Sequence, residues 1–72
     1  MEKITLKAAR VIAGLTQEDV ARIGNISRGT VGNWERGTAI PDGVQLLGLA
    51  SLYKVDIDDL ILPEVQALSS QS

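Results

Sequence analysis

The 72-residue sequence contains no cysteine, no histidine and no phenylalanine, and its only aromatic side chains are Trp34 and Tyr53. The absence of cysteine and histidine excludes disulfide bonds and zinc clusters, and it leaves the redox compartment undetermined. A catalytic site would lack both the commonest general base and the strongest thiol nucleophile. We therefore expect no enzyme, no metal site and no cofactor.

Long apolar runs are also missing. No stretch approaches the ~20 apolar residues needed to span a bilayer, and the first residues, MEKITLKAAR, have no uninterrupted apolar core of the signal-peptide type. We expect a cytoplasmic protein without a membrane partner. The length and the 44% apolar composition suit one small, mostly helical domain. We place this domain at residues 1–63, followed by a flexible tail at 64–72.

The charge is small in sum but uneven along the chain. The formal net charge is −2, with six bases against four acids in residues 1–36 and one base against five acids in residues 37–72. The first half, at +2, can present a basic face, whereas the second half, at −4, repels polyanions. The acids Asp56, Asp58 and Asp59 lack the spacing of a calcium loop, so we interpret them as capping and solubilising residues.

Helix start and stop signals divide the chain into short segments. A threonine, serine or aspartate suitable as an N-cap precedes each segment, and glycine, a Gly-Asn pair or proline marks several of the ends. The predicted helices are residues 6–13, 17–23, 28–36, 43–54 and 57–62. No strand pattern is visible. The predicted fold class is therefore all-α, with five short helices.

The second and third predicted helices, joined by Gly24 and Asn25, form a helix-turn-helix. Ala21 provides the small residue that such a unit needs where its helices touch, and Val31 the apolar residue on the buried side. The rest of the third helix carries side chains that can hydrogen-bond to base edges or contact a thymine methyl. These are Ser27, Arg28, Thr30 and Asn33.

The stretch LTQEDVARIGNISRGTVGNWERGTAIP resembles the Cro/repressor-type helix-turn-helix family, also called the XRE family, over about Leu6 to Leu60. The resemblance implies a lambda-repressor-like DNA-binding domain, similar to small temperate-phage switch regulators. It implies a structural ion pair between Arg10 and Glu35 that links the first and third helices. It also implies contacts with DNA for Gln17, Arg28, Gly29, Asn33, Arg36 and Thr38. Together with Ser27 and Thr30, these residues form the predicted surface for DNA or a protein partner.

Two glycines, Gly29 and Gly32, lie inside the predicted recognition helix. Each costs roughly 1 kcal/mol of helix stability relative to alanine. Small residues allow a helix to lie close to a groove floor or to the backbone of a partner. A neutral surface position is the alternative interpretation of Gly32.

The second half of the chain has more large aliphatic residues than so small a core can bury. We assign five of them to a protein interface: Leu47, Leu52, Ile57, Ile61 and Leu62. The family resemblance implies a homodimer through the C-terminal helices, which would place two recognition helices about 34 Å apart. The alternative is that these side chains only cover a loosely packed end.

Two functions remain open at this point. The first is a regulator of a phage-type genetic switch that binds double-stranded operator DNA through the helix Ser27–Arg36. The second is an antirepressor that binds the cognate repressor protein through the same surface, which the acidic pI of about 4.8 favours. An antitoxin is a third hypothesis, although the chain has no recognisable toxin-binding extension.

Overall fold

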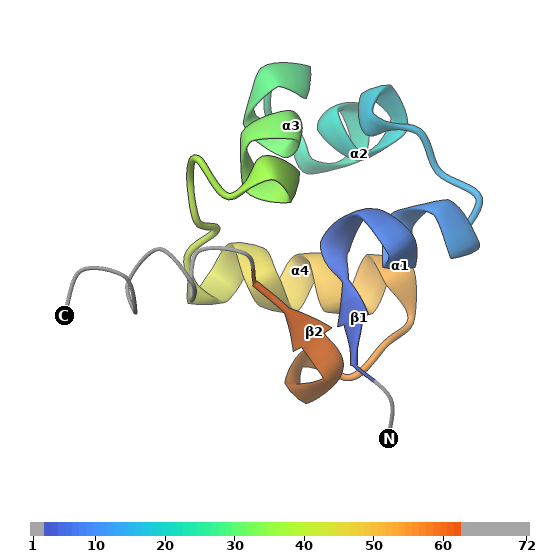
Figure 1. The fold of residues 1–72 in the computed structure, drawn as a ribbon. Helices are drawn as coiled ribbons and strands as arrows, with labels where there is room; N and C mark the ends of the chain where they lie inside the picture. The colour runs from blue at the N-terminus through green and yellow to red at the C-terminus, as the bar shows by residue number, and fades with distance from the viewer. Residues whose placement is uncertain (1–2, 63–72) are drawn as a thin grey trace, which may run out of the picture.

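The computed structural model describes residues 3–62, which form a small helical fold with one pair of very short strands (Figure 1). The elements are β1 (Ile4–Thr5), α1 (Leu6–Ile12), α2 (Gln17–Gly24), α3 (Arg28–Arg36), α4 (Gly43–Tyr53), the 3-10 helix η1 (Ile57–Asp59) and β2 (Leu60–Ile61). Helices α2 and α3 pack against each other on one side of the molecule, and α4 lies on the other (Figure 1). The predicted tail, residues 64–72, lies outside the described residues.

The first four predicted helices are confirmed, and their N-caps explain where they begin. Thr5, Thr16, Ser27 and Asp42 each accept a hydrogen bond from the backbone N–H three residues later. At Thr16 the side chain of Asp19 completes a capping box. The ends differ from the prediction by one residue in three helices, where the cap follows Ile12, Gly24 and Tyr53.

The predicted fifth helix is wrong, and so is the expectation of no strand. Residues 57–59 form a 3-10 turn, and Leu60–Ile61 pair in parallel with Ile4–Thr5. Pro63 disfavours a helical backbone at the residue before it, and the β-branched Ile61 suits a strand. Pairing also buries Leu60 in the core, while Asp56 makes no side-chain capping bond.

The core draws on all four α-helices and on β2. Its fully or largely buried side chains are Leu6, Ala9, Val20, Ala21, Val31, Trp34, Leu49, Ala50, Tyr53 and Leu60. The small side chain of Ala21 and the buried Val31 lie in the paired helices α2 and α3, as the motif requires. Burial of these residues fixes α3 against α1, α2 and α4, so that its opposite side faces outward. No helix in residues 3–62 is long and apolar enough to cross a membrane.

Candidate nucleic-acid interface

The turn between α2 and α3 sets the direction of the exposed helix. Asn25 adopts the left-handed conformation, with φ 57° and ψ 45°, which asparagine tolerates better than most residues. Ser27 then caps α3, accepting a hydrogen bond from the Thr30 N–H at 3.1 Å. The Ser27 and Thr30 hydroxyls lie 2.8 Å apart, so both side chains serve the first turn of the helix.

A shallow hollow of about 300 Å³ lies along the outer side of α3. Arg28, Gly32 and Arg36 are spaced four residues apart and therefore share one face of the helix. Gly29 also lines the hollow, and Gln17 reaches it from the first turn of α2. Guanidinium groups and a side-chain amide above a glycine floor suit the oxygens of a phosphate backbone.

Gly32 is not the neutral surface position that was one interpretation of the sequence. It is buried, and a Cβ atom at this position would lie 3.0 Å from Arg36 Nη1 and 3.8 Å from Gln17 Nε2. Any larger residue would therefore displace the Arg36 guanidinium. Gly29 differs, because it is exposed and a Cβ atom there would lie 3.8 Å from its nearest neighbour, Ser27 Oγ.

The far end of α3 is tied to the loop that follows. Gly37 has a left-handed backbone, with φ 84°, and turns the chain so that Thr38 comes back to Asn33. The Asn33 side-chain oxygen accepts from Arg36 Nη2 at 2.5 Å and from Thr38 Oγ1 at 3.1 Å. A bidentate contact of Asn33 with adenine uses this same oxygen. Such a contact therefore requires Arg36 and Thr38 to release it.

A buried ion pair holds α3 against α1. Arg10 Nε donates to Glu35 Oε2 at 2.7 Å and Arg10 Nη2 to Oε1 at 3.3 Å, while Arg10 Nη1 donates to the Leu15 carbonyl at 2.9 Å. Gln17 Nε2 donates to Glu35 Oε1 at 3.0 Å. The side chains of Arg10 and Glu35 are only 10% and 5% exposed. This network fixes the angle between the first three helices.

The network also changes two pKa values. The hydrogen bond to Glu35 raises the pKa of Arg10 and outweighs the opposing effect of burial. Burial first, and then the negative charge of Glu35, raise the pKa of Tyr53 to about 12 against the opposing charge of Arg10. Arg10 is therefore a permanent cation inside the domain.

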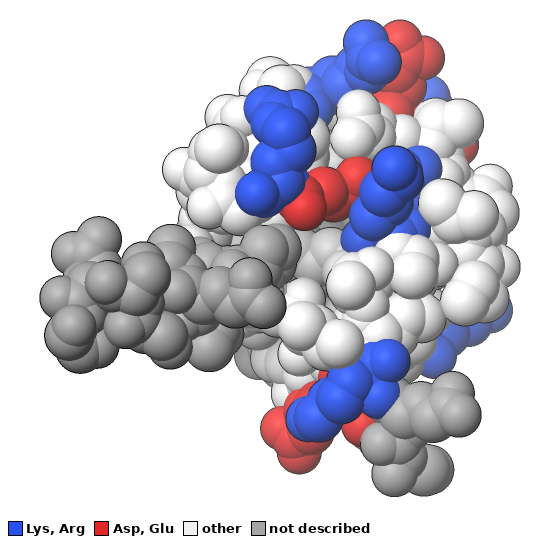
Figure 2. Space-filling view, in the orientation of Figure 1, with Lys and Arg blue, Asp and Glu red and all other residues white. Residues whose placement is uncertain are grey.

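The cations on the outside of the domain are few and separate. Arg28 is exposed, and Arg22 pairs with Asp19 at 3.1 Å on the surface of α2. In the space-filling view the basic side chains form several groups with acidic or uncharged atoms between them (Figure 2). The visible face thus has local positive sites rather than one continuous basic surface.

The five side chains predicted to form a protein interface come from different elements. Leu52, Ile57 and Leu62 are half-buried and pack against the core, which agrees with the alternative that they cover one end of it. Leu47 on α4 and Ile61 in β2 remain exposed. Five other exposed apolar residues among the described ones were not assigned to an interface from the sequence, namely Val11, Ile12, Ile23, Ile40 and Val44. The exposure of Val44 could have been predicted from the sequence, because Val44 lies three residues before Leu47 and therefore on the same face of α4.

Trp34 is buried and belongs to the core, and so it is not a contact residue of the outer α3 surface. The residues predicted to bind DNA or a partner lie at or near that surface. The structure brings Gln17, Arg28, Gly29 and Arg36 together in the hollow. Ser27 and Thr30 lie at the beginning of α3, and Asn33 and Thr38 at its end.

The fold and the outward side of α3 define a helix-turn-helix protein. The family model described as Helix-turn-helix matches residues 6–60. The chain belongs to this family, in its XRE-type (Cro/repressor-type) form.

The HTH-type transcriptional regulator ImmR of Bacillus subtilis (strain 168) is 43% identical to the chain over 56 residues. The match covers 78% of this chain and 44% of that protein, so the chain spans less than half the length of this curated relative. No solved structure shows a significant match to the chain.

Proposed function

We propose that the chain is a transcriptional regulator of a phage-type genetic switch that binds operator DNA with α3 in the major groove. The observation that carries this proposal is the hollow on α3, where the guanidinium groups of Arg28 and Arg36 and the side-chain amide of Gln17 lie around Gly29 and Gly32. Membership of the helix-turn-helix family and the name of the similar Bacillus protein support it.

The roles of the side chains follow from their positions. Gln17 and Arg36, at the edges of the hollow, donate to phosphate oxygens and set the register of the helix. Arg28 begins α3 and is exposed, so it can reach guanine O6 and N7. Thr30 and Asn33 are half-buried on the same helix and offer shorter-range contacts to neighbouring bases. Ser27 and Thr38 hold the two ends of the helix, and Thr38 can donate to the DNA backbone only if it releases Asn33.

The salt dependence of binding should be modest for a DNA-binding domain. Arg28 and Arg36 are the cations of the hollow. Two or three neutralised phosphates give a slope of about −2 to −3 in a plot of log affinity against log salt concentration for each copy of the domain. The net charge of −2 further weakens non-specific binding.

The test is binding of the purified protein to its flanking intergenic DNA, and to scrambled DNA, at two salt concentrations. Arg28→Ala should lower the affinity for the specific site by about 10- to 100-fold, the value of one bidentate base contact. Lys54→Asn is the matched control, since it removes one charge from an exposed position outside the hollow, and asparagine tolerates the left-handed backbone there. Equal binding to specific and scrambled DNA, unchanged by Arg28→Ala, would rule out sequence-specific binding through α3.

A second candidate function is an antirepressor that binds the DNA-reading surface of a cognate repressor. Two observations favour it, the charge of −4 in residues 37–72 and the separate basic groups of the visible face (Figure 2). A repressor's DNA-reading surface is basic and would attract an acidic partner. In the same binding experiment, an antirepressor would not bind the DNA when it is the only protein present. It would dissolve the repressor–DNA complex when both proteins are present.

A further inference from the structure

The side-chain amide of Asn33 is held in one orientation by its neighbours on the outer side of α3. Its oxygen, Oδ1, accepts one hydrogen bond from Arg36 Nη2 at 2.5 Å and another from Thr38 Oγ1 at 3.1 Å. A guanidinium carries only donors, so the amide atom that faces Arg36 must be the oxygen and not the nitrogen. The two bonds use both lone pairs of this oxygen. The Asn33 side chain therefore offers a ligand only the two N–H donors of Nδ2.

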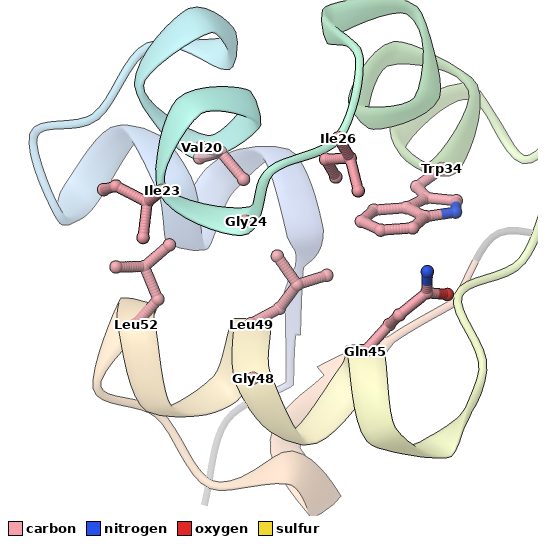
Figure 3. Close-up of a pocket in the computed structure, with 9 residues that line it drawn as sticks. All are labelled: Val20, Ile23, Gly24, Ile26, Trp34, Gln45, Gly48, Leu49 and Leu52. Carbon is pink, nitrogen blue, oxygen red and sulfur yellow. The ribbon is translucent and has the colours of Figure 1, made fainter.

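The backbone of Asn33 is fixed from two sides. Its carbonyl accepts hydrogen bonds from the backbone N–H groups of residues 37–39 at 2.9, 3.0 and 3.3 Å, so the loop after α3 is closed onto this residue. The next residue, Trp34, is buried, and its ring points toward α4, where the Gln45 amide lies beneath it (Figure 3). The orientation of the Asn33 amide is thus set before any ligand arrives.

Gly32 makes room for the bond between Arg36 and Asn33. Arg36 Nη1 lies 3.0 Å from the place that a Cβ atom of residue 32 would occupy, so the guanidinium rests over the glycine. From there Nη2 reaches Asn33, while the other N–H groups of Arg36 remain for a phosphate oxygen. Arg36 can therefore hold the Asn33 amide and contact the DNA backbone at the same time.

The four bases differ in what they offer a group that only donates. In the major groove, guanine presents two neighbouring acceptors, N7 and O6, and thymine presents one acceptor, O4, beside a methyl group. Adenine presents the acceptor N7 beside the N6 amino group, whose natural partner is the Asn33 oxygen that is already occupied. Cytosine presents only an amino group. Guanine is therefore the best partner for the Asn33 side chain, and cytosine is the worst.

We propose that Asn33 selects guanine in the operator, and that Arg36 and Thr38 are positioning residues that make its amide a donor only. This inference rests on the proposed function, DNA binding through α3. It differs from the bidentate pairing with adenine that an unrestrained asparagine prefers. Because the amide is ordered in the free protein, the contact with guanine loses little conformational entropy on binding.

The test begins with selection of binding sites for the purified chain from double-stranded DNA with a randomised central sequence. The selection is repeated with Asn33→Ala, and the base pair whose preference disappears is the one that Asn33 contacts. Dissociation constants are then measured for DNA with each of the four base pairs at that position. The G·C pair in its preferred orientation should bind at least about 5-fold more tightly than an A·T pair in either orientation, the lower limit for a bidentate base contact.

Variants of the positioning residues should change this preference. Thr38→Val removes the hydroxyl at an exposed position and frees one lone pair of the Asn33 oxygen, so the preference for guanine should decrease. Gly32→Ala/Thr38→Val also displaces the guanidinium, which is the end of a flexible side chain, and should make adenine the preferred base. Thr38→Ser keeps the hydroxyl and is the matched control that should retain the preference for guanine. A phosphate contact acts equally on all four DNA molecules and cancels in their ratio.

A measurement without DNA tests whether the amide is held. Rotation of the Arg36 guanidinium about its Cζ–Nε bond, followed by NMR, should be slower in the unmodified chain than in Asn33→Ala, which lacks the acceptor. The exposed Arg28 serves as the internal reference and should rotate equally fast in both proteins.

Four results would overturn the inference while leaving the proposed function intact. The first is sequence-specific binding in which an A·T pair is preferred at the position that Asn33 contacts. The second is a selected site that Asn33→Ala does not change. The third is a preference for guanine that survives in Gly32→Ala/Thr38→Val. The fourth is equally fast rotation of the Arg36 guanidinium with and without Asn33. Equal binding to all DNA sequences would instead contradict the proposed function, and this inference would fail with it.

Discussion

Replacing Glu35 with alanine should reduce the stability of this domain more than most substitutions outside the apolar core. The Glu35 carboxylate is 5% exposed and accepts hydrogen bonds from Arg10 at 2.7 and 3.3 Å and from Gln17 at 3.0 Å. Without it, the Arg10 guanidinium keeps one bond of this network, the 2.9 Å contact with the Leu15 carbonyl. Removing one partner of a buried ion pair typically lowers the free energy of unfolding by about 3–5 kcal/mol.

Arg10 cannot escape this cost by losing its proton. An arginine pKa lies far above neutral pH, and removing Glu35 would not bring it near the working range. The charge must remain buried, or the helix must open and admit water. A domain of this length has a total stability of about 4–11 kcal/mol. The loss is therefore a large fraction of the total, and the variant should be partly unfolded near physiological temperature.

Urea denaturation followed by Trp34 fluorescence measures this effect. Trp34 is the single tryptophan, is buried, and lies next to Glu35 in the sequence. The single variants Arg10→Met and Glu35→Leu and the double variant Arg10→Met/Glu35→Leu form a double-mutant cycle with the unmodified chain. The double variant should be more stable than the sum of the single losses by about 1–3 kcal/mol, because no unpaired charge is left in the core.

Arg22→Ala provides the comparison for an exposed ion pair. The side chains of Arg22 and Asp19 are 72% and 30% exposed, so solvent screens their interaction and the loss should be a small part of that caused by Glu35→Ala. If Glu35→Ala costs no more than Arg22→Ala, the buried pair does not stabilise the domain as described. Strict additivity in the cycle would refute the coupling between Arg10 and Glu35.

Three further predictions concern ionisation and backbone strain. The pKa of Tyr53, measured by phenolate absorbance, should be about 12 in the native protein against about 10 in urea. Stability should therefore fall as pH rises from 10 toward 12, and a native pKa near 10 would contradict this. Hydrogen bonds from the Thr16 backbone and then its side chain lower the pKa of Asp19 below 3.8, so its contribution is present above that pH and disappears in stronger acid. Asp19→Asn should accordingly lower the urea midpoint at neutral pH, and the difference from the unmodified chain should shrink as the pH falls below 3.8. Lys54 has a left-handed backbone with a φ of 60°, which strains a residue other than glycine. Lys54→Gly should therefore raise the free energy of unfolding, measured by urea denaturation, by up to about 1 kcal/mol. A lower free energy of unfolding in this variant would show that the backbone at Lys54 is not strained.

Local signals made most of the fold predictable. Each of the first four helices has a capping side chain whose partner lies three residues away, so its beginning can be found within one turn of sequence. The strand pair has no such signal. Leu60 becomes part of a strand because Ile4, at the opposite end of the chain, offers an edge to pair with. A window of sequence around Leu60 contains aspartate caps and aliphatic residues, which are equally compatible with a helix.

In the candidate site, too, some features could be predicted from the sequence and others could not. Arg28, Gly32 and Arg36 are separated by four residues each, and this spacing alone predicts that they share one face of the helix. The partners of Asn33 could not be deduced, because Thr38 reaches its side-chain oxygen only after Gly37 has turned the backbone. The burial of Gly32 under Arg36 also needs the rotamer of a long side chain, which the spacing does not specify.

The acidity of the chain has less effect on α3 than the net charge of −2 suggests. Glu35 is the only acid within α3, and Arg10 neutralises it inside the domain. Asp19 is paired with Arg22 on the neighbouring helix. The acids Asp58 and Asp59 belong to η1, which lies at the opposite end of the molecule from α3 (Figure 1). Lys3 and Lys54 lie beside Asp56 and Asp59 and offset part of their charge, so the domain is only weakly asymmetric. In the field of a polyanion it would turn η1 away and α3 toward the ligand. This asymmetry would favour the approach of α3 to the DNA that we propose as its ligand.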